Sequence, residues 1–182
     1  YRPGIVVGHS ETGEMDKVDG PYYFFKLIRR IRSVVPAWLP LLGVEGREIN
    51  IVPVDFVVRA MDHIAHKDDL DGRAFSLTDP HPHSAGEVID IFARAAHAPQ
   101  TSVRVPAAVT EALGPVLGRT VSAVPLGNTL TDSVLADFGV PRSVLMYLNY
   151  PTHFDSRRTE AALAGTDIAV PPLEAYAGKL WD

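Results

Sequence analysis

The chain has no cysteine among its 182 residues, so disulfide bonds and thiolate sites are excluded. It also has no apolar run long enough to cross a membrane and no visible signal peptide. Basic residues are outnumbered by acidic ones, with 17 Lys and Arg against 22 Asp and Glu. The resulting net charge of -5 argues against a broad nucleic-acid-binding surface. The remaining composition, with 46% hydrophobic residues, is that of a globular domain with a sizeable core.

The first eight residues place the apolar run Ile5-Val6-Val7 between Gly4 and Gly8. β-Branched residues bounded by glycine are typical of a parallel strand that is buried on both faces. Such a strand needs neighbours, and nothing precedes it in this sequence. We therefore expect residues 1–182 to be the C-terminal, back part of a larger α/β domain, truncated at both ends.

The rest of the chain predicts an alternation of helices and strands. Helices are expected at about 21–35, 53–66, 84–96, 107–117, 121–137 and 155–165, and strands at 49–52, 74–78 and 101–105. Ser84 and Glu87 have the spacing of a capping box. The buried stripe of the second helix is expected to consist of Val54, Val57, Val58, Met61 and Ile64.

The order of these pieces resembles the C-terminal half of extended short-chain dehydrogenase/reductases. It is carried by Arg2-Pro3 before an apolar strand and a glycine, by Val52-Pro53-Val54-Asp55 at a helix start, and by residues 72–80 before a capped helix. Residues 2–13 and 165–173 are similar to the fatty acyl-CoA reductase and thioester-reductase branch. The resemblance implies the back part of an extended Rossmann-type, NAD(P)-binding fold, with a mostly helical substrate-binding subdomain.

What the resemblance implies for function is reduction of a fatty acyl thioester, acyl-CoA or another, by NADPH, giving aldehyde or alcohol. The family's Gly-rich phosphate loop and its Tyr-x-x-x-Lys acid/base pair belong to its front half, and no Gly-rich loop follows a strand here. We therefore expect no catalytic residue in these 182 residues and no activity from them alone. The backbone of Pro3, Gly4 and Ile5 would hold the nicotinamide of NADP.

The substrate pocket is expected to include the loop residues His9 and Ser10, together with Phe24, Ile28, Trp38 and Met146. Two other interpretations of the basic helix at 21–35 and of Trp38 stay open: contact with a membrane surface, or core packing beneath a solvated outer face. We expect a cytoplasmic protein, with peripheral membrane association left open. The oligomeric state is not indicated.

Several short motifs admit other chemistry. Tyr22 and Lys26 match Tyr-x-x-x-Lys, but they follow the Arg-Pro strand instead of preceding it, so we interpret the match as coincidence. Residues 8–13 resemble a nucleophile elbow whose last glycine is one residue late, which keeps a serine hydrolase using Ser10 and His153 as an alternative. Asp79-Pro80-His81-Pro82-His83 is expected to be a surface loop without a metal.

Two further alternatives share the expected fold. One is a sugar-nucleotide epimerase or dehydratase of the same superfamily, which would need a polar pocket that accepts phosphate. The other is a non-catalytic domain that senses a dinucleotide or binds a protein. The apolar character of residues 21–43 argues mildly against the first.

Overall fold

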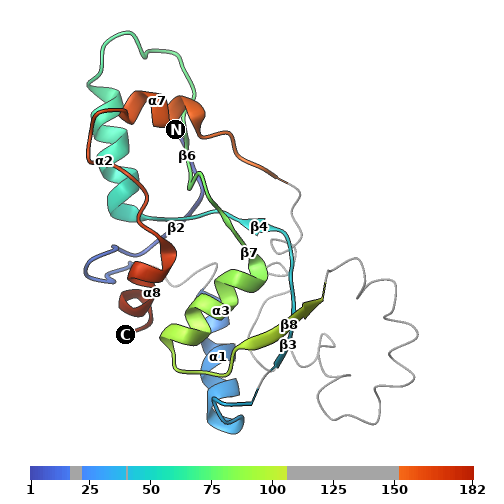
Figure 1. The fold of residues 1–182 in the computed structure, drawn as a ribbon. Coiled ribbons are helices and arrows are strands. Elements are labelled where there is room, and N and C mark those ends of the chain that lie inside the picture. The colour runs from blue at the N-terminus through green and yellow to red at the C-terminus, as the bar shows by residue number, and fades with distance from the viewer. Residues whose placement is uncertain (17–21, 40, 106–151) are drawn as a thin grey trace. The chain divides into compact units, whose positions relative to one another are not determined.

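The computed structural model describes residues 1–16, 22–39, 41–105 and 152–182 (Figure 1). Helices and strands alternate along these residues, as an α/β fold requires. The described residues fall into two compact units, a first unit of residues 1–16, 48–83 and 152–182 and a second unit of residues 22–39, 41–47 and 84–105. The helices predicted at 107–117 and 121–137, and the helix start predicted at residues 19–21, lie outside the described residues.

The first unit contains short strands and three helices. Its strands are β1 (Arg2–Pro3), β2 (Ile5–Val7), β4 (Glu48–Ile49), β5 (Ile51–Pro53) and β6 (Ser76–Leu77), and its helices are α2 (Val54–Ala65), α7 (Arg157–Leu163) and α8 (Leu173–Trp181). β7 (His83–Ser84) leads into the second unit, which contains α1 (Tyr23–Val34), β3 (Leu41–Val44), α3 (Ala85–Ala95) and β8 (Thr101–Val105).

The N-terminal strand of the first unit runs between two parallel neighbours. β1 pairs with β6, and β2 pairs with β5. Successive N–H groups point to opposite sides: that of Gly4 donates to Leu77 (3.1 Å) and that of Ile5 donates to Asn50 (2.8 Å). The predicted strand at Ile5–Val7 is confirmed, but its expected burial on both faces is wrong, since Val6 is 41% exposed.

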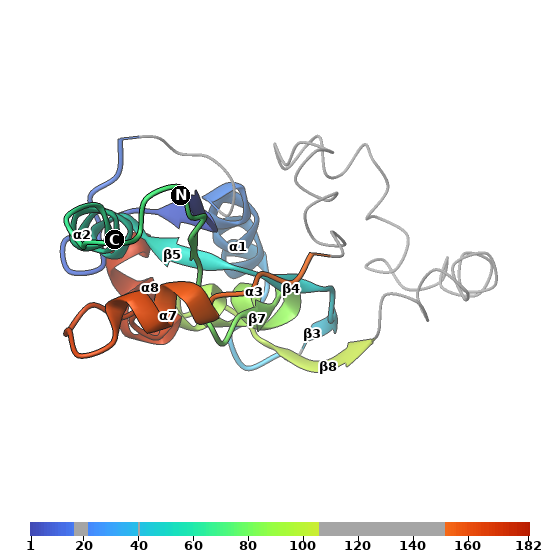
Figure 2. The same ribbon diagram turned by 90° about the horizontal axis from the view of Figure 1, so that it is seen from above.

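The core of the first unit lies where β5 runs directly into α2 (Figure 2). Side chains from both elements pack with others from β6 and α7, namely Val52, Phe56, Val57, Ala60, Ile64, Phe75, Leu77, Ala162 and Leu163. The predicted stripe of α2 is correct at Val57 and Ile64 and wrong at Val58 and Met61, which are 59% and 38% exposed. The buried face is rotated toward Phe56 and Ala60, because β6 and α7 cover that side of the helix.

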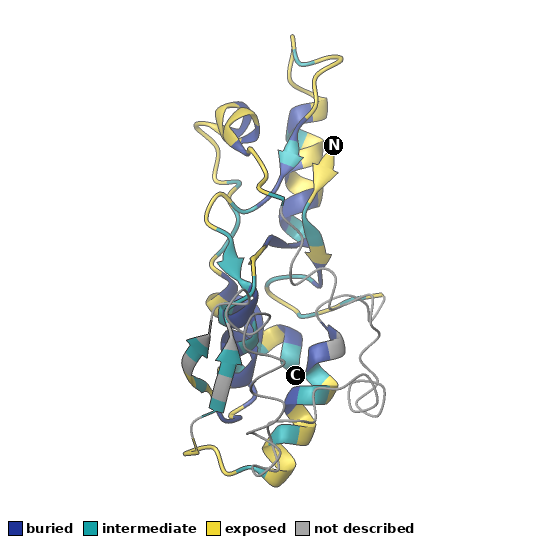
Figure 3. Ribbon diagram, turned by 90° about the vertical axis from the view of Figure 1, so that its right-hand side faces the viewer, coloured by how far each residue is buried: buried dark blue, intermediate teal, exposed yellow. Residues whose placement is uncertain are grey.

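In the second unit, α1 packs against α3. Phe24 and Ile28 of α1 are buried, and the ring of Phe25 meets that of Phe92 edge-on at 4.9 Å. Each of these helices has buried residues on one side and exposed residues on the other. Figure 3, which is coloured by burial, shows this alternation along the helices. The predicted capping box is confirmed, since the Ser84 hydroxyl accepts from the Glu87 N–H and the Glu87 carboxylate accepts from the Ser84 N–H. The apolar segment after α1 ends in β3, which pairs with β8.

A buried carboxylate ties β8 to α3 in this second unit. Asp90 is 4% exposed and accepts hydrogen bonds from the N–H and hydroxyl of Thr101 (2.9 and 2.5 Å) and from Arg104 (2.6 Å to Nη2). Burial acts to raise the pKa of Asp90, but the hydrogen bonds from Thr101 and Arg104 outweigh it and lower that pKa below its usual value. The charged form is therefore the one that holds the strand.

Replacing Asp90 by Ala should lower the free energy of unfolding by about 2 kcal/mol, because the donors of Thr101 and Arg104 lose their acceptor. The stabilisation should be present above the ordinary pKa of 3.8 and be lost as the pH falls through the lowered pKa of the folded state. Urea unfolding followed by circular dichroism measures both effects. Asp62→Ala is the control, because this carboxylate is 76% exposed and its contact within the described part of the chain is an ion pair with His66 at 3.5 Å. An equal loss in both variants would contradict the assigned role.

Candidate functional site

The loop that follows β2 is closed on itself and then fixed to α2. The N–H of His9 donates to the Glu14 carbonyl (2.9 Å), and the N–H of Gly13 donates to the His9 carbonyl (2.8 Å). Gly13 has φ +74°, and a Cβ there would overlap the Lys179 carbonyl, so this position requires glycine. The glycine that comes one residue too late for a nucleophile elbow is thus explained by the turn.

Asp55, in the first turn of α2, anchors this loop. Its Oδ1 accepts from the Ser10 N–H (2.8 Å) and its Oδ2 accepts from the Ser10 hydroxyl (2.7 Å). His9 lies close by, with Nδ1 4.0 Å from Asp55 Oδ1. Burial acts to raise the pKa of Asp55, but the hydrogen bonds from Ser10 outweigh it and lower the pKa below its usual value. At neutral pH the anchor is therefore a carboxylate.

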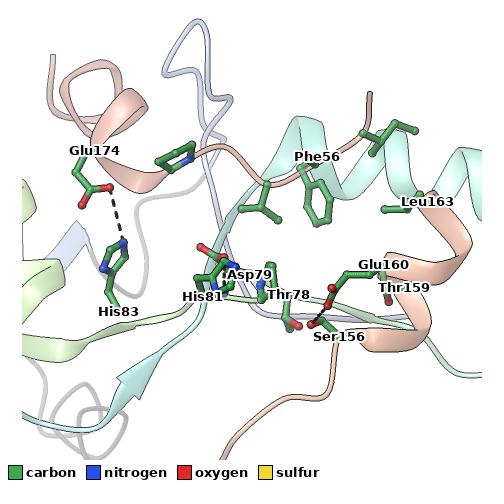
Figure 4. A pocket seen from close by; sticks show the side chains of 15 residues that line it. Phe56, Thr78, Asp79, His81, His83, Ser156, Thr159, Glu160, Leu163 and Glu174 are labelled. Carbon is green, nitrogen blue, oxygen red and sulfur yellow. Dashed lines mark hydrogen bonds and ion pairs between the residues drawn. The ribbon is translucent and has the colours of Figure 1, made fainter. Parts of the chain in front are cut away.

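A cavity of about 410 Å³ lies in the first unit at the carboxyl end of β6. Thr78 and Asp79, which directly follow β6, lie at its centre (Figure 4). Phe56 of α2 and Leu163 of α7 form one side, and the ion pair of His83 with Glu174 (3.7 Å) stands on the opposite side. The segment after α7 completes the apolar walls with Ile168, Ala169, Val170 and Pro172. Ligands of open α/β folds bind at this end of parallel strands, so the cavity is a candidate binding site.

Two threonines of the cavity differ in their hydrogen bonding. The Thr159 hydroxyl donates to the Ser76 carbonyl (2.7 Å), which ties α7 to β6. The Thr78 hydroxyl is buried, and it has no hydrogen-bond partner among the residues that the structure describes. A buried polar atom without a partner is costly, so Thr78 is available for a ligand that reaches this side of the cavity.

Carboxyl groups give the cavity its polar character. Burial raises the pKa of Asp79, whose carboxylate accepts a hydrogen bond from the His81 N–H (2.9 Å). Glu160 is engaged by the Ser156 hydroxyl at 2.5 Å. The site therefore combines apolar walls with acids, one of which holds its proton more firmly than usual.

The residues that the sequence singles out for substrate binding are not gathered at this cavity. His9 and Ser10 lie in the anchored loop, Phe24 and Ile28 are buried in the second unit, and Trp38 is 80% exposed. Met146 lies outside the described residues. The roles assigned to these six residues stay predictions. Sequence reasoning missed Thr78, Asp79 and Asp55 as site residues, although Asp55 is part of the helix-start motif and Asp79 opens the His-containing loop.

The backbone at Pro3, Gly4 and Ile5 restricts how it could hold a nicotinamide. Pro3 has no N–H, and the N–H groups of Gly4 and Ile5 are taken by β6 and by Asn50. The carbonyl oxygens of this segment are the groups that fit a carboxamide, as acceptors for its NH₂. The sequence offers no Gly-rich loop after a strand for the pyrophosphate, so these residues would hold one end of a dinucleotide only.

Two of the alternative chemistries lack their geometry here. The Ser10 hydroxyl donates to Asp55, and His153 pairs instead with Glu48 (2.9 Å) at an exposed position. The serine–histidine contact that a hydrolase needs is thus not formed. Within the described ranges, no three His, Asp or Glu side chains cluster as metal ligands.

Comparison with known proteins agrees with the expected resemblance. Residues 1–61 match the NAD-binding family described as Male sterility protein. The whole chain is 30% identical to part of the nonribosomal peptide synthetase hkm10 of Aspergillus hancockii, and it covers 17% of that protein. It is 35% identical over 80 residues to the aldehyde reductase lnbA of Aspergillus flavus, covering 44% of this chain and 7% of lnbA.

The fold has a counterpart among solved structures. The terminal R domain from the myxalamid PKS-NRPS pathway superposes with a TM-score of 0.61 at 23% identity, covering 98% of this chain and 41% of that one. The expected α/β, extended Rossmann-type fold is thereby confirmed. The chain thus resembles an NAD-binding family over residues 1–61 and shares its fold with a terminal R domain of a PKS-NRPS pathway. It spans a small part of the curated relatives that it matches.

Replacing Asp55 by Ala should release the loop between residues 8 and 14. Hydrogen bonds to a charged group contribute about 1.5–3 kcal/mol, so the Ser10 amide should exchange its hydrogen at least about tenfold faster. The protection should persist at neutral pH and fall as the pH drops through the lowered pKa of Asp55. Glu14→Ala serves as the control, since the contact that its carboxylate makes with described residues is a weak one, from the Thr12 hydroxyl at 3.4 Å. Unchanged exchange in Asp55→Ala would refute the anchor.

Thr78→Val and Thr159→Val form a matched pair for the cavity. Val has nearly the shape of Thr, so each substitution removes one hydroxyl and little else. Thr78→Val should leave the free energy of unfolding unchanged or raise it by about 1 kcal/mol, because an unpartnered group is removed. Thr159→Val should lower it by about 1–2 kcal/mol, because the Ser76 carbonyl loses its donor. Thermal or urea unfolding separates the two, and a destabilised Thr78→Val would show that its hydroxyl has a partner.

Proposed function

We propose that this protein uses NADPH to reduce an acyl thioester, a fatty acyl-CoA or a related thioester, to the aldehyde or alcohol. The observation that carries the proposal is the 30% identity to a nonribosomal peptide synthetase along the whole chain. The match of residues 1–61 to an NAD-binding family and the local similarity to an aldehyde reductase support it. The choice of NADP over NAD, and of an acyl-CoA over other thioesters, belongs to the proposal.

The described residues can contribute binding and positioning to such a reaction. NADPH, when bound, supplies the hydride. The carbonyl oxygens near Pro3 and Gly4 would orient the carboxamide, and the loop held by Asp55 would stand beside the thioester. Catalytic proton transfer is not assigned to any residue described here.

The cavity suits the apolar part of such a substrate. Phe56, Leu163 and Ile168 form apolar walls, and burial of each methylene of an acyl chain contributes about 0.8 kcal/mol. These apolar walls suit an acyl chain better than the polar sugar of the epimerase or dehydratase alternative. A non-catalytic domain is an outcome that the assay below can give.

The test is NADPH oxidation by the full-length protein with long and short acyl-CoA substrates and with a sugar nucleotide. We expect turnover with acyl thioesters, a preference for long chains, and slower turnover with NADH. Aldehyde or alcohol is identified by mass spectrometry. Conversion of the sugar nucleotide without net NADPH oxidation, detected by mass spectrometry or chromatography, would support the epimerase or dehydratase instead. Binding of NADPH without any turnover would support the non-catalytic domain.

Ser10→Ala distinguishes a reductase from a hydrolase. The proposal assigns Ser10 to loop positioning, and its N–H still donates to Asp55 in the variant. Reductase activity should therefore stay within about tenfold of the unchanged protein, which corresponds to about 1.4 kcal/mol of transition-state stabilisation. Covalent labelling of Ser10 by a fluorophosphonate would instead support the serine hydrolase alternative. Ser156, whose hydroxyl donates to Glu160, is the internal control for labelling.

A further inference from the structure

The end of α1 and the turn after it expose large apolar side chains. Val34 is 65% exposed, Trp38 is 80% exposed and Leu39 is 37% exposed. Val34 is the last residue of α1, and a hydrogen bond from the Leu39 N–H to the Pro36 carbonyl (3.0 Å) closes the turn that carries Trp38 and Leu39. Single exposed apolar residues are common, but three large ones within six positions form a patch that marks an interaction surface.

The same surface is basic. Lys26, Arg29, Arg30 and Arg32 of α1 are exposed, and residues 22–39 contain no Asp or Glu although the whole chain carries a net charge of -5. Lys26, Arg30 and Val34 follow one another at intervals of four residues, so they lie along one face of the helix. A basic stripe therefore leads directly to the apolar tip.

Packing of the second unit does not require this face. Phe24 and Ile28 are buried on the other side of α1, and Phe25 contacts Phe92 of α3. The helix is thus held by its apolar side, whereas Lys26, Arg30 and Val34 and the turn with Trp38 are exposed. We call Lys26, Arg30, Val34, Trp38 and Leu39 the α1 surface.

We propose that the α1 surface docks on a bilayer containing anionic lipid, with Trp38 and Leu39 at the level of the headgroups and with Lys26 and Arg30 against the lipid phosphates. Tryptophan favours the boundary between headgroups and acyl chains, because its ring is apolar and its N–H can remain hydrogen-bonded to water. Each Arg near an anionic bilayer surface strengthens binding about fivefold. The combination of an exposed tryptophan with a basic helix face is the composition by which helices bind at the surface of anionic bilayers.

Contact of this kind is peripheral. Every helix in the described part of the chain is too short or too polar to pass through a bilayer. The proposal does not rest on the proposed reductase activity, because vesicle binding is measured without substrate or cofactor. Loss of one proposal therefore leaves the other standing.

The experiment uses the 182-residue chain and vesicles of phosphatidylcholine with or without phosphatidylglycerol. The chain has two tryptophans, so Trp181→Phe leaves Trp38 as the fluorescent reporter. We expect co-sedimentation and a blue shift of Trp38 emission with the anionic vesicles, and about tenfold or more weaker binding without phosphatidylglycerol or at high salt.

Matched variants separate the surface from net charge and general hydrophobicity. Arg30→Glu should weaken binding at least about tenfold, whereas Arg73→Glu makes the same charge change at an exposed site of the first unit and should change it little. Trp38→Ala should weaken it about tenfold, whereas Val58→Ala, at another exposed apolar residue, should not. Circular dichroism of each variant verifies the fold.

Three results would overturn the proposal. Binding that is equal with and without anionic lipid would remove the charge argument. Equal losses in Arg30→Glu and Arg73→Glu would show that net charge alone is sensed. A blue shift without vesicles that depends on protein concentration, with dimers in sedimentation equilibrium, would assign the α1 surface to a second copy of the chain.

Discussion

The first unit depends on how the Asn50 side chain bridges two strands. Its amide N–H donates to the Asp79 carbonyl and its Oδ1 accepts from the Asp79 N–H, both at 2.8 Å. These two hydrogen bonds link the start of β5 to the residues that follow β6. They pass close to Gly4, where a Cβ would come within 2.8 Å of Asn50 Oδ1. Because β5 continues into α2 and β6 continues into the cavity, one buried amide sets the positions of both the Asp55 anchor and the Thr78 hydroxyl. The absence of a side chain at residue 4 is what makes this bridge possible.

Two aspartates of the first unit show how similar groups acquire different properties. Asp55 receives two hydrogen bonds from Ser10, and its pKa is lowered, whereas Asp79 receives one from the His81 N–H and burial raises its pKa. Burial acts in the same direction on both. Asp79 is the more deeply buried and has fewer donors, so only at Asp55 do the hydrogen bonds outweigh burial. The carboxylate that anchors the loop is therefore stabilised in its charged form, while burial opposes the charge of the acid in the cavity.

Local patterns in the sequence identify most elements but not the long-range contacts that build the site. The Ser84–Glu87 capping box and the helix at Val54–Ala65 are predictable because their signals lie within a few residues. The buried face of α2 is predicted only in part, since Val58 and Phe56 are both apolar and only the packing of β6 and α7 selects between them. The Ser10–Asp55 contact joins residues 45 positions apart, and the cavity joins β6 to a helix some 80 residues later. No periodicity in the sequence encodes such distances.

Taken together, the two proposals assign different physical tasks to different parts of the chain. A long acyl thioester partitions into bilayers, because each buried methylene contributes about 0.8 kcal/mol. An enzyme that docks on the same bilayer would meet this substrate at a raised local concentration, and a weak, salt-sensitive contact would still let it leave. The α1 surface has the composition for such a contact, since Trp38 adds one apolar anchor and Lys26 and Arg30 add charge that salt can screen. Reversible docking and an apolar cavity thus suit the same kind of substrate, although each stands on its own observations.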